Sequence, residues 1–192
     1  VHFSDAKPNF IIVPLKAIVE GEPVTGPDLS REEWEDLKLR HTKGLPVFMA
    51  CCGAPGHLRS SKSGTQHFYH AAETGCNYAG ESGEHLAIKE LVYRTCRSEG
   101  WETTVEFTAP DRSWVSDVFA TRDGRNIVFE IQISTISPDE LAERDEKYQN
   151  AGIESYWLLD NFLGRTRDFA ACSDVVLRGE DGLPLAKIPY ID

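Results

Sequence analysis

The chain has 192 residues, of which 41% are hydrophobic and 27% charged, a globular composition that excludes wholesale disorder. No apolar run approaches the roughly 20 residues that a membrane-spanning helix needs, so no membrane partner is expected. The net charge is −11, and residues 81–192 carry −10 of it, which excludes a basic protein that simply coats DNA.

Residues 1–43 are expected to form a β-hairpin followed by a short helix. Two short apolar runs predict the strands: Phe10–Val13 and Lys16–Val19. Ser30 and Glu33 have the spacing of a capping box, which predicts a helix that begins there and ends near Leu39. Because the first residue is Val1 rather than Met, we expect a piece excised from a longer protein.

Residues 44–80 differ from the rest, because they combine many Gly and Pro residues with three Cys and three His. They hold too few apolar side chains to pack alone, and four nitrogen and sulfur ligands around Zn²⁺ would supply the missing folding energy. The preferred ligands, with two alternates in brackets, are Cys52, His57, His70 and Cys76 (Cys51, His67). The competing interpretation is that these are buried thiols and histidines satisfied by hydrogen bonds.

The five cysteines are odd in number and lack the spacing of a disulfide framework. A secreted disulfide scaffold is therefore not expected, whereas reduced thiols in the cytoplasm or a metal site are.

From residue 81 onward, alternating patterns predict a mixed α/β core with the order αβββαβ over residues 81–165. The expected elements are a helix at Ser82–Arg97, strands at Thr103–Thr108, Val115–Thr121 and Asn126–Thr135, a helix from Ser137 to Asn150, and a strand at Ser155–Asp160. Residues 166–192 form a C-terminal extension, with a strand expected at Asp174–Leu177.

The dipeptide Asp123-Gly124 predicts a two-residue hairpin turn, which fixes the register of the strands on either side. In that register Asp117 lies directly opposite Glu130, with Cβ atoms about 4.5–5.5 Å apart. Two facing carboxylates repel each other. Either this face of the sheet is solvated, or a divalent cation lies between the two acids.

The helix expected at Ser82–Arg97 favours the cation. Its apolar arc predicts that Glu84 points toward the sheet as a third carboxylate, with His85 and Lys89 flanking the same cleft.

These residues resemble the PD-(D/E)XK nucleases, and more closely the competence protein CoiA-like nuclease family. The resemblance covers roughly residues 45–165. It is carried by CCGAPGH (51–57), HFYH (67–70), Cys76, GESGEHLAIK (80–89), SDVFA (116–120), VFEIQISTIS (128–137), the Arg144/Tyr148 pair and YWLLD (156–160). It implies a restriction-endonuclease-like core with a zinc-ribbon-like segment before it.

The resemblance also implies roles for single residues. Asp117 and Glu130, with the Ile131 carbonyl, would ligate Mg²⁺ or Mn²⁺, and Glu84 would join directly or through water. Gln132 stands where the family usually has Lys. Because Gln supplies no positive charge, Lys89 or the metal would have to cover that role. The supporting residues are His85, Ser134, Arg144 and Tyr148, and the last two could equally be ordinary helix-surface residues.

The sequence therefore predicts a Mg²⁺-dependent nuclease acting on DNA in natural transformation or phage defence, with exonuclease, nickase and endonuclease action all open. The alternative is an inactive nuclease-fold module that binds nucleic acid or a protein. A third reading is an interaction domain within a larger protein or a homodimer.

Overall fold

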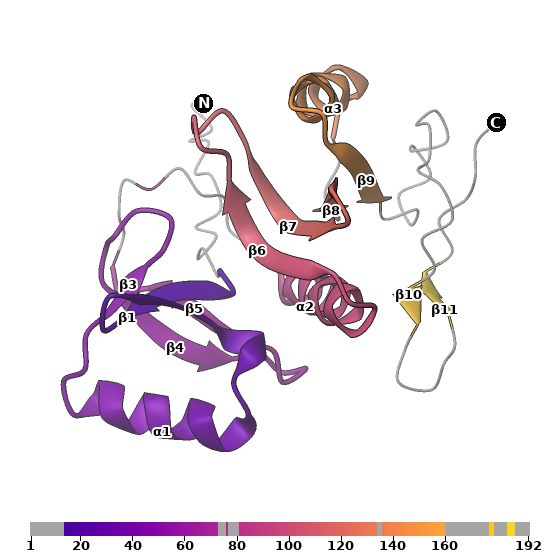
Figure 1. Ribbon diagram of the computed structural model, residues 1–192. Coiled ribbons are helices and arrows are strands. Elements are labelled where there is room, and N and C mark those ends of the chain that lie inside the picture. Colours follow the sequence, from indigo (N-terminus) through magenta and orange to yellow (C-terminus); the bar gives the residue numbers. More distant parts are fainter. Residues whose placement is uncertain are drawn as a thin grey trace, which may run out of the picture. The chain divides into compact units, whose positions relative to one another are not determined.

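The computed structural model describes residues 14–72, 76, 81–133, 136–159, 177–178 and 184–186. Its contacts divide the chain into two units, Val1–Leu86 and Ala87–Asp192. The first unit contains β1 (Lys16–Val19), β2 (Glu22–Thr25), the 3-10 helix η1 (Gly26–Asp28), α1 (Arg31–Thr42), β3 (Val47–Met49), β4 (Gly56–Ser60) and β5 (Gln66–His70) (Figure 1).

The first unit is built on a sheet of strand order β2-β1-β3 and a hairpin of β4 and β5. The predicted capping box of α1 is confirmed, because Ser30 accepts the Glu33 N–H and Glu33 accepts the Ser30 N–H. α1 continues three residues past the predicted end at Leu39. The predicted strand at Phe10–Val13 lies outside the described residues.

One hydrophobic core joins the two segments that the sequence suggested were distinct. Its buried members come from both: Ala17, Val19, Trp34, Leu37, Val47, Met49 and Phe68. The few apolar side chains of residues 44–80 thus pack against the strands and helix that precede them. A metal is therefore not the sole source of order in this segment.

The second half of the chain has the predicted order αβββαβ. Its elements are α2 (Gly83–Ser98), β6 (Glu102–Thr108), β7 (Val115–Arg122), β8 (Arg125–Gln132), α3 (Pro138–Asn150) and β9 (Glu154–Leu159). The strands lie side by side in the order β6-β7-β8-β9 (Figure 1). β6, β7 and β8 are antiparallel, and β9 runs parallel to β8 after the α3 crossover.

The predicted turn and register between β7 and β8 are confirmed. Asp123 and Gly124 both have positive φ, 52° and 80°, as the tight hairpin turn requires. The pairs that follow include Arg122↔Arg125 and Val118↔Phe129. Continuing this register places Asp117 opposite Glu130.

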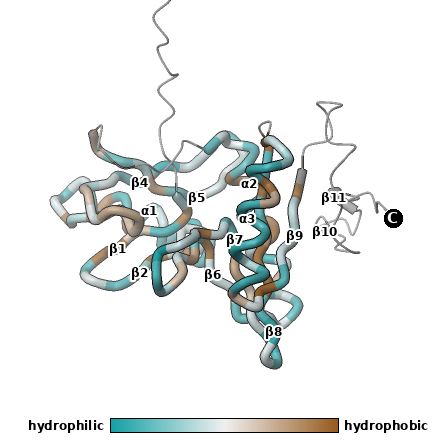
Figure 2. Tube along the Cα trace, turned by 90° about the horizontal axis from the view of Figure 1, so that it is seen from above, coloured by the Kyte–Doolittle hydropathy of each residue, from teal (hydrophilic) through white to brown (hydrophobic). Residues whose placement is uncertain are grey.

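α3 begins at a capping box formed by Ser137 and Glu140, with Pro138 at its first position. Most of the helix is hydrophilic, as the colouring of Figure 2 shows, and Tyr148 is its buried residue. Tyr148 packs with Val128 and Trp157 in a second core cluster. This packing holds the last turns of α3 on the face of the sheet that carries Glu130.

Two short strands, β10 (Leu177–Arg178) and β11 (Pro184–Ala186), pair with each other. Of the strand predicted at Asp174–Leu177, only Leu177 is among the described residues. No helix in the described part of the chain is both long and apolar enough to span a membrane.

Candidate metal centres

Three acidic residues form a row across the strands of the second unit. Regular pairing of β7 with β8 ends at Val118↔Phe129, which leaves Asp117 opposite Glu130. On the other side, β6 pairs Val105↔Val118 and Phe107↔Ser116, so Glu106 lies opposite Asp117. We call Glu106, Asp117 and Glu130 the acid row. The sequence had pointed to two of its three members.

Asp117, in the middle of the acid row, has donors at both carboxylate oxygens. Oδ2 accepts the backbone N–H of Ile131 at 2.8 Å. Oδ1 lies 3.2 Å from the Lys89 ammonium nitrogen, which comes from α2. That same nitrogen lies 3.5 Å from Glu106 Oε1, so Lys89 bridges two members of the row.

Lys89 is completely buried, with 0% of its surface exposed. A buried ammonium is stable only when carboxylates or other acceptors replace its lost hydration. Lys89 therefore holds a positive charge against Asp117, where the sequence predicted a metal ion.

Glu130 is buried, and its two carboxylate oxygens are both engaged. Oε2 accepts a bond of 2.6 Å from the Arg144 guanidinium, and Oε1 accepts a short bond from the Tyr148 hydroxyl. Arg144 also lies over the Trp157 ring, 5.0 Å from its centroid. Burial, followed by repulsion from Asp117, raises the pKa of Glu130 to about 8, although the Arg144 charge acts in the opposite direction.

The two predicted supporting residues of α3 thus both contact Glu130. Their spacing of four residues places them on one helix face, and the short β8–α3 connection brings that face over the acid.

Gln132 lies at the end of β8, beyond the acid row. It lines a cavity of about 290 Å³ together with Ile136, Glu140, Glu143 and Arg144. Arg144 is therefore shared between Glu130 and this cavity. The predicted supporting residue Ser134 lies outside the described residues.

The predicted orientation of Glu84 is wrong, because Glu84 is exposed. The buried side of α2 is instead formed by Leu86, Lys89, Val92, Tyr93 and Cys96. The prediction placed Lys89 at the flank of the buried arc, beside the cleft, whereas here Lys89 lies at the centre of the buried side. The neighbouring His85 lies 3.7 Å from Glu81, one helical turn earlier.

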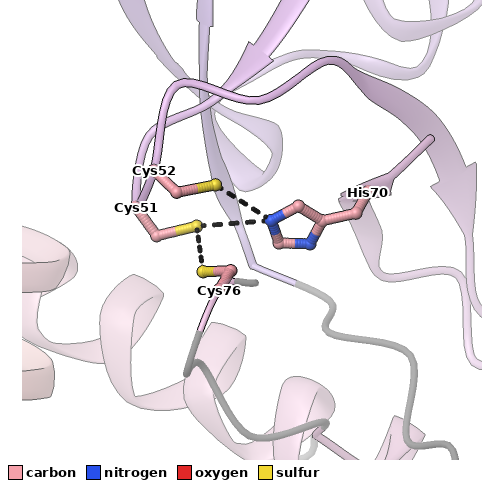
Figure 3. A group of neighbouring side chains, drawn as sticks. All are labelled: Cys51, Cys52, His70 and Cys76. Carbon is pink, nitrogen blue, oxygen red and sulfur yellow. Dashed lines mark hydrogen bonds between the residues drawn. The ribbon is translucent and has the colours of Figure 1, made fainter. Parts of the chain in front are cut away.

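A second group of potential metal ligands lies in the first unit: Cys51, Cys52, His70 and Cys76 (Figure 3). Cys51 and Cys52 follow β3 in a tight turn closed by a bond from the Gly53 N–H to the Met49 carbonyl. His70 ends β5 and directs its Nε2 atom toward both thiols, at 3.8 Å from Cys51 Sγ and 3.2 Å from Cys52 Sγ. Cys76 Sγ lies 3.7 Å from Cys51 Sγ.

These separations suit a tetrahedral metal ion. Ordinary Zn–S and Zn–N bonds at tetrahedral angles place sulfur atoms about 3.8 Å apart and nitrogen about 3.6 Å from sulfur. Burial lowers the pKa of His70, which favours the neutral ring that binds metals. Burial and then the two neighbouring thiols raise the pKa of Cys51, a rise that a bound cation would reverse.

The structure differs from the preferred quartet at one position, since Cys51 replaces His57. The ring of His57 instead bonds His41, with 2.8 Å between Nδ1 and Nε2. The alternate His67 is buried and bonds the Thr65 carbonyl at 3.0 Å. Adjacent cysteines at the tip of one turn can both face His70, a geometry that the spacing alone did not reveal.

Residues 81–174 match the family model described as competence protein CoiA, nuclease-like domain. This segment, just under half of the chain, is therefore similar to that nuclease-like domain. The match contains every element from α2 to β9, and with them the acid row, Lys89, Arg144 and Tyr148. No curated protein matches the sequence. The CoiA nuclease-like family points to a nuclease-type function in competence.

Proposed function

We propose that the segment of this chain that matches the CoiA nuclease-like domain is a metal-dependent deoxyribonuclease of the PD-(D/E)XK type. The observation that carries the proposal is the acid row, in which Glu106 and Glu130 are buried and Asp117 is partly buried, and which is balanced by two cationic side chains. Taking these carboxylates out of water is costly even when they are paired, so hydrophobic side chains would serve a purely structural sheet at least as well. A phosphodiesterase gains a place for a divalent cation.

The residues present suit such a cation in their chemistry. Asp117 and Glu130 offer carboxylate oxygens from facing strand positions, and the Ile131 carbonyl is the neighbouring backbone oxygen. Mg²⁺ or Mn²⁺ prefers such oxygen ligands, and when bound it supplies Lewis acidity and lowers the pKa of bound water. Lys89 and Arg144 lie against these acids, which supports a site whose carboxylates attract positive charge.

Lys89 would supply the positive charge of the family's usual lysine, whose position is occupied by Gln132 in this chain. Its ammonium group stabilises developing negative charge, which the neutral amide of Gln132 cannot do. Gln132 can still donate to and accept from water in its cavity. Arg144, half exposed between Glu130 and that cavity, is placed to contact a phosphate. DNA uptake in competence is the favoured setting, with phage defence as the alternative.

The test is cleavage of linear duplex, circular duplex and single-stranded DNA with Mg²⁺, with Mn²⁺ or with EDTA. Asp117→Asn retains an oxygen that can accept the Ile131 N–H but removes the charge, so cleavage should fall by at least about 100-fold while the fold is kept. The matched control is Asp123→Asn, an acid in the exposed turn of the same hairpin, where Asn tolerates positive φ equally well. Cleavage that survives Asp117→Asn would contradict the proposal.

Lys89→Met is the second variant. It should abolish cleavage if Lys89 replaces the usual lysine, and methionine fills a similar apolar volume in the core. Full activity of a folded Lys89→Met protein would show that the lysine is only a structural counter-ion.

We also propose that Cys51, Cys52, His70 and Cys76 hold a structural Zn²⁺, which makes residues 44–80 a zinc-ribbon-like segment. All four positions are taken by protein ligands, which is typical of structural rather than catalytic zinc. The support is the agreement of their separations with a tetrahedral site.

A second candidate function is a nuclease-fold module that binds nucleic acid or a protein without cutting. It is favoured by the engagement of all four carboxylate oxygens of Asp117 and Glu130 with protein donors. Folded protein that binds DNA but neither binds Mn²⁺ nor cleaves would establish this second function.

A further inference from the structure

Glu106 lies in an unusual backbone conformation for a residue inside a strand. Its φ is 51°, in the left-handed region, while Val105 and Phe107 on either side pair regularly with β7. For a residue other than glycine, this conformation costs about 1–2 kcal/mol. Glu106 is also only 7% exposed, so the strand keeps a strained, buried acid opposite Asp117.

The contacts of Lys89 suggest why the strand keeps a strained, buried acid at position 106. Asp117 uses Oδ2 for the Ile131 N–H, and its other oxygen, Oδ1, faces the Lys89 ammonium. A divalent cation that binds Asp117 must therefore compete with Lys89 for Oδ1. Lys89 is wholly buried, so the ammonium group has no direct route to solvent, but Glu106 Oε1 lies 3.5 Å from it.

We propose that Glu106 is a positioning residue, which retains Lys89 as its counter-ion when a divalent cation takes Asp117. This inference rests on the proposed metal site. Without Glu106, a metal bound at Asp117 would leave the buried Lys89 ammonium beside a dication, with the Asp117 carboxylate already committed to that metal. Glu106 thus lets the site hold both the metal and Lys89, which supplies the positive charge that Gln132 lacks.

The experiment measures Mn²⁺ binding by calorimetry to the full 192-residue chain, without nucleic acid and with zinc already supplied. Asp117→Asn identifies the heat that belongs to the acid row. We expect Glu106→Gln to weaken this binding by at least about tenfold, equivalent to about 1.4 kcal/mol. The matched control is Glu102→Gln, an exposed acid on the same strand, which should leave the affinity unchanged.

A double-mutant cycle with Lys89→Met separates the proposed role from direct ligation. If Glu106 acts through Lys89, then Glu106→Gln changes Mn²⁺ affinity less than about threefold when Lys89 is already Met. An equal loss in both backgrounds would make Glu106 a metal ligand and overturn the inference. If Glu106→Gln caused no loss of Mn²⁺ affinity in the chain that retains Lys89, that result would overturn the inference as well.

Failure of the proposed metal site has a different signature, because the unmodified chain would then show no Mn²⁺ binding that Asp117→Asn abolishes. Metal-free Glu106→Gln keeps Asp117 beside Lys89 and should fold, as melting curves will check. If it does not, Glu106→Asp retains the charge. Affinity within about threefold of wild type then supports the inference, and a tenfold loss overturns it.

Discussion

The protonation of Glu130 gives the most direct test of the acid row, because it predicts an unusual dependence of stability on pH. The pKa of Glu130 is raised from 4.5 to about 8 in the folded chain, first by burial and then by Asp117. Between these two values the folded state binds a proton that the unfolded state has lost. The free energy of unfolding must therefore fall as pH rises through this window.

The magnitude follows from one proton. A single group with separated pKa values contributes at most about 1.4 kcal/mol per pH unit, so Glu130 should remove roughly 1–3 kcal/mol between pH 5 and pH 7. This stabilising contribution is complete below pH 4.5 and is lost as pH rises toward 8. Glu130→Gln keeps the shape of the side chain but removes the titrating group. The free energy of unfolding of this variant should therefore not fall in this way as pH rises.

The assay is urea unfolding in EDTA at several pH values, followed by tryptophan fluorescence. Trp101, Trp114 and Trp157 lie in the second unit and report on its unfolding. The control is Glu154→Gln, which removes an exposed carboxylate whose pKa is lowered by its bond to Arg125. Glu154 is already ionised above pH 5, so this variant should retain the wild-type slope. Equal slopes in wild type and Glu130→Gln would refute the reasoning.

Two further predictions concern the first unit. Cys76→Ser should release one equivalent of zinc, measured by atomic emission, and lower the melting temperature. The control Cys96→Ala should lower stability without loss of metal, since Cys96 is a buried core thiol outside the group. Unchanged zinc content in Cys76→Ser would contradict the proposed site. Gly26→Ala should lower the free energy of unfolding by about 1–3 kcal/mol in denaturant titrations, because its Cβ would lie 2.3 Å from the Gln66 carbonyl oxygen. In the control Gly83→Ala the new Cβ meets no atom within 4 Å, so this variant should be neutral or stabilising. Equal stabilities of the two variants would contradict this prediction.

The β7–β8 part of the acid row could be predicted from sequence because a two-residue turn fixes a register. Asp123-Gly124 leaves one way to align the strands, and Asp117 then falls opposite Glu130. Glu106 could not be placed in the same way. The β6–β7 connection spans residues 109–114, and a connection of that length admits several registers. The left-handed conformation of Glu106 has no signature in the sequence either.

The error at Glu84 has a related cause. Hydrophobic periodicity ranks lysine among the most exposed residues, so the buried side of α2 was centred on its apolar residues. The helix in fact turns Lys89 inward, because two carboxylates of the sheet compensate its charge. Hydrophobic periodicity ranks each side chain by its preference for an apolar interior. It therefore cannot predict a buried ion pair that a helix residue forms with a strand distant in the sequence.

The Cys/His group shows a similar limit on a smaller scale. Composition identified the segment, since residues 44–80 combine turn residues with thiols and imidazoles. Which four converge depends on the tight turn at Gly53, with φ 73°, and on the β4–β5 pairing that ends at His70. That pairing also places His57 opposite Tyr69, where it can bond His41 rather than join the thiols.

The acid row contributes three of the acidic residues behind the net charge of −10 of residues 81–192. With Glu130 protonated below its pKa of about 8, the two other carboxylates of the row are matched by the cations Lys89 and Arg144. A divalent metal at the proposed site would make its charge positive, and a phosphate would then be attracted to it. On the proposed function, DNA binding should therefore depend on metal loading.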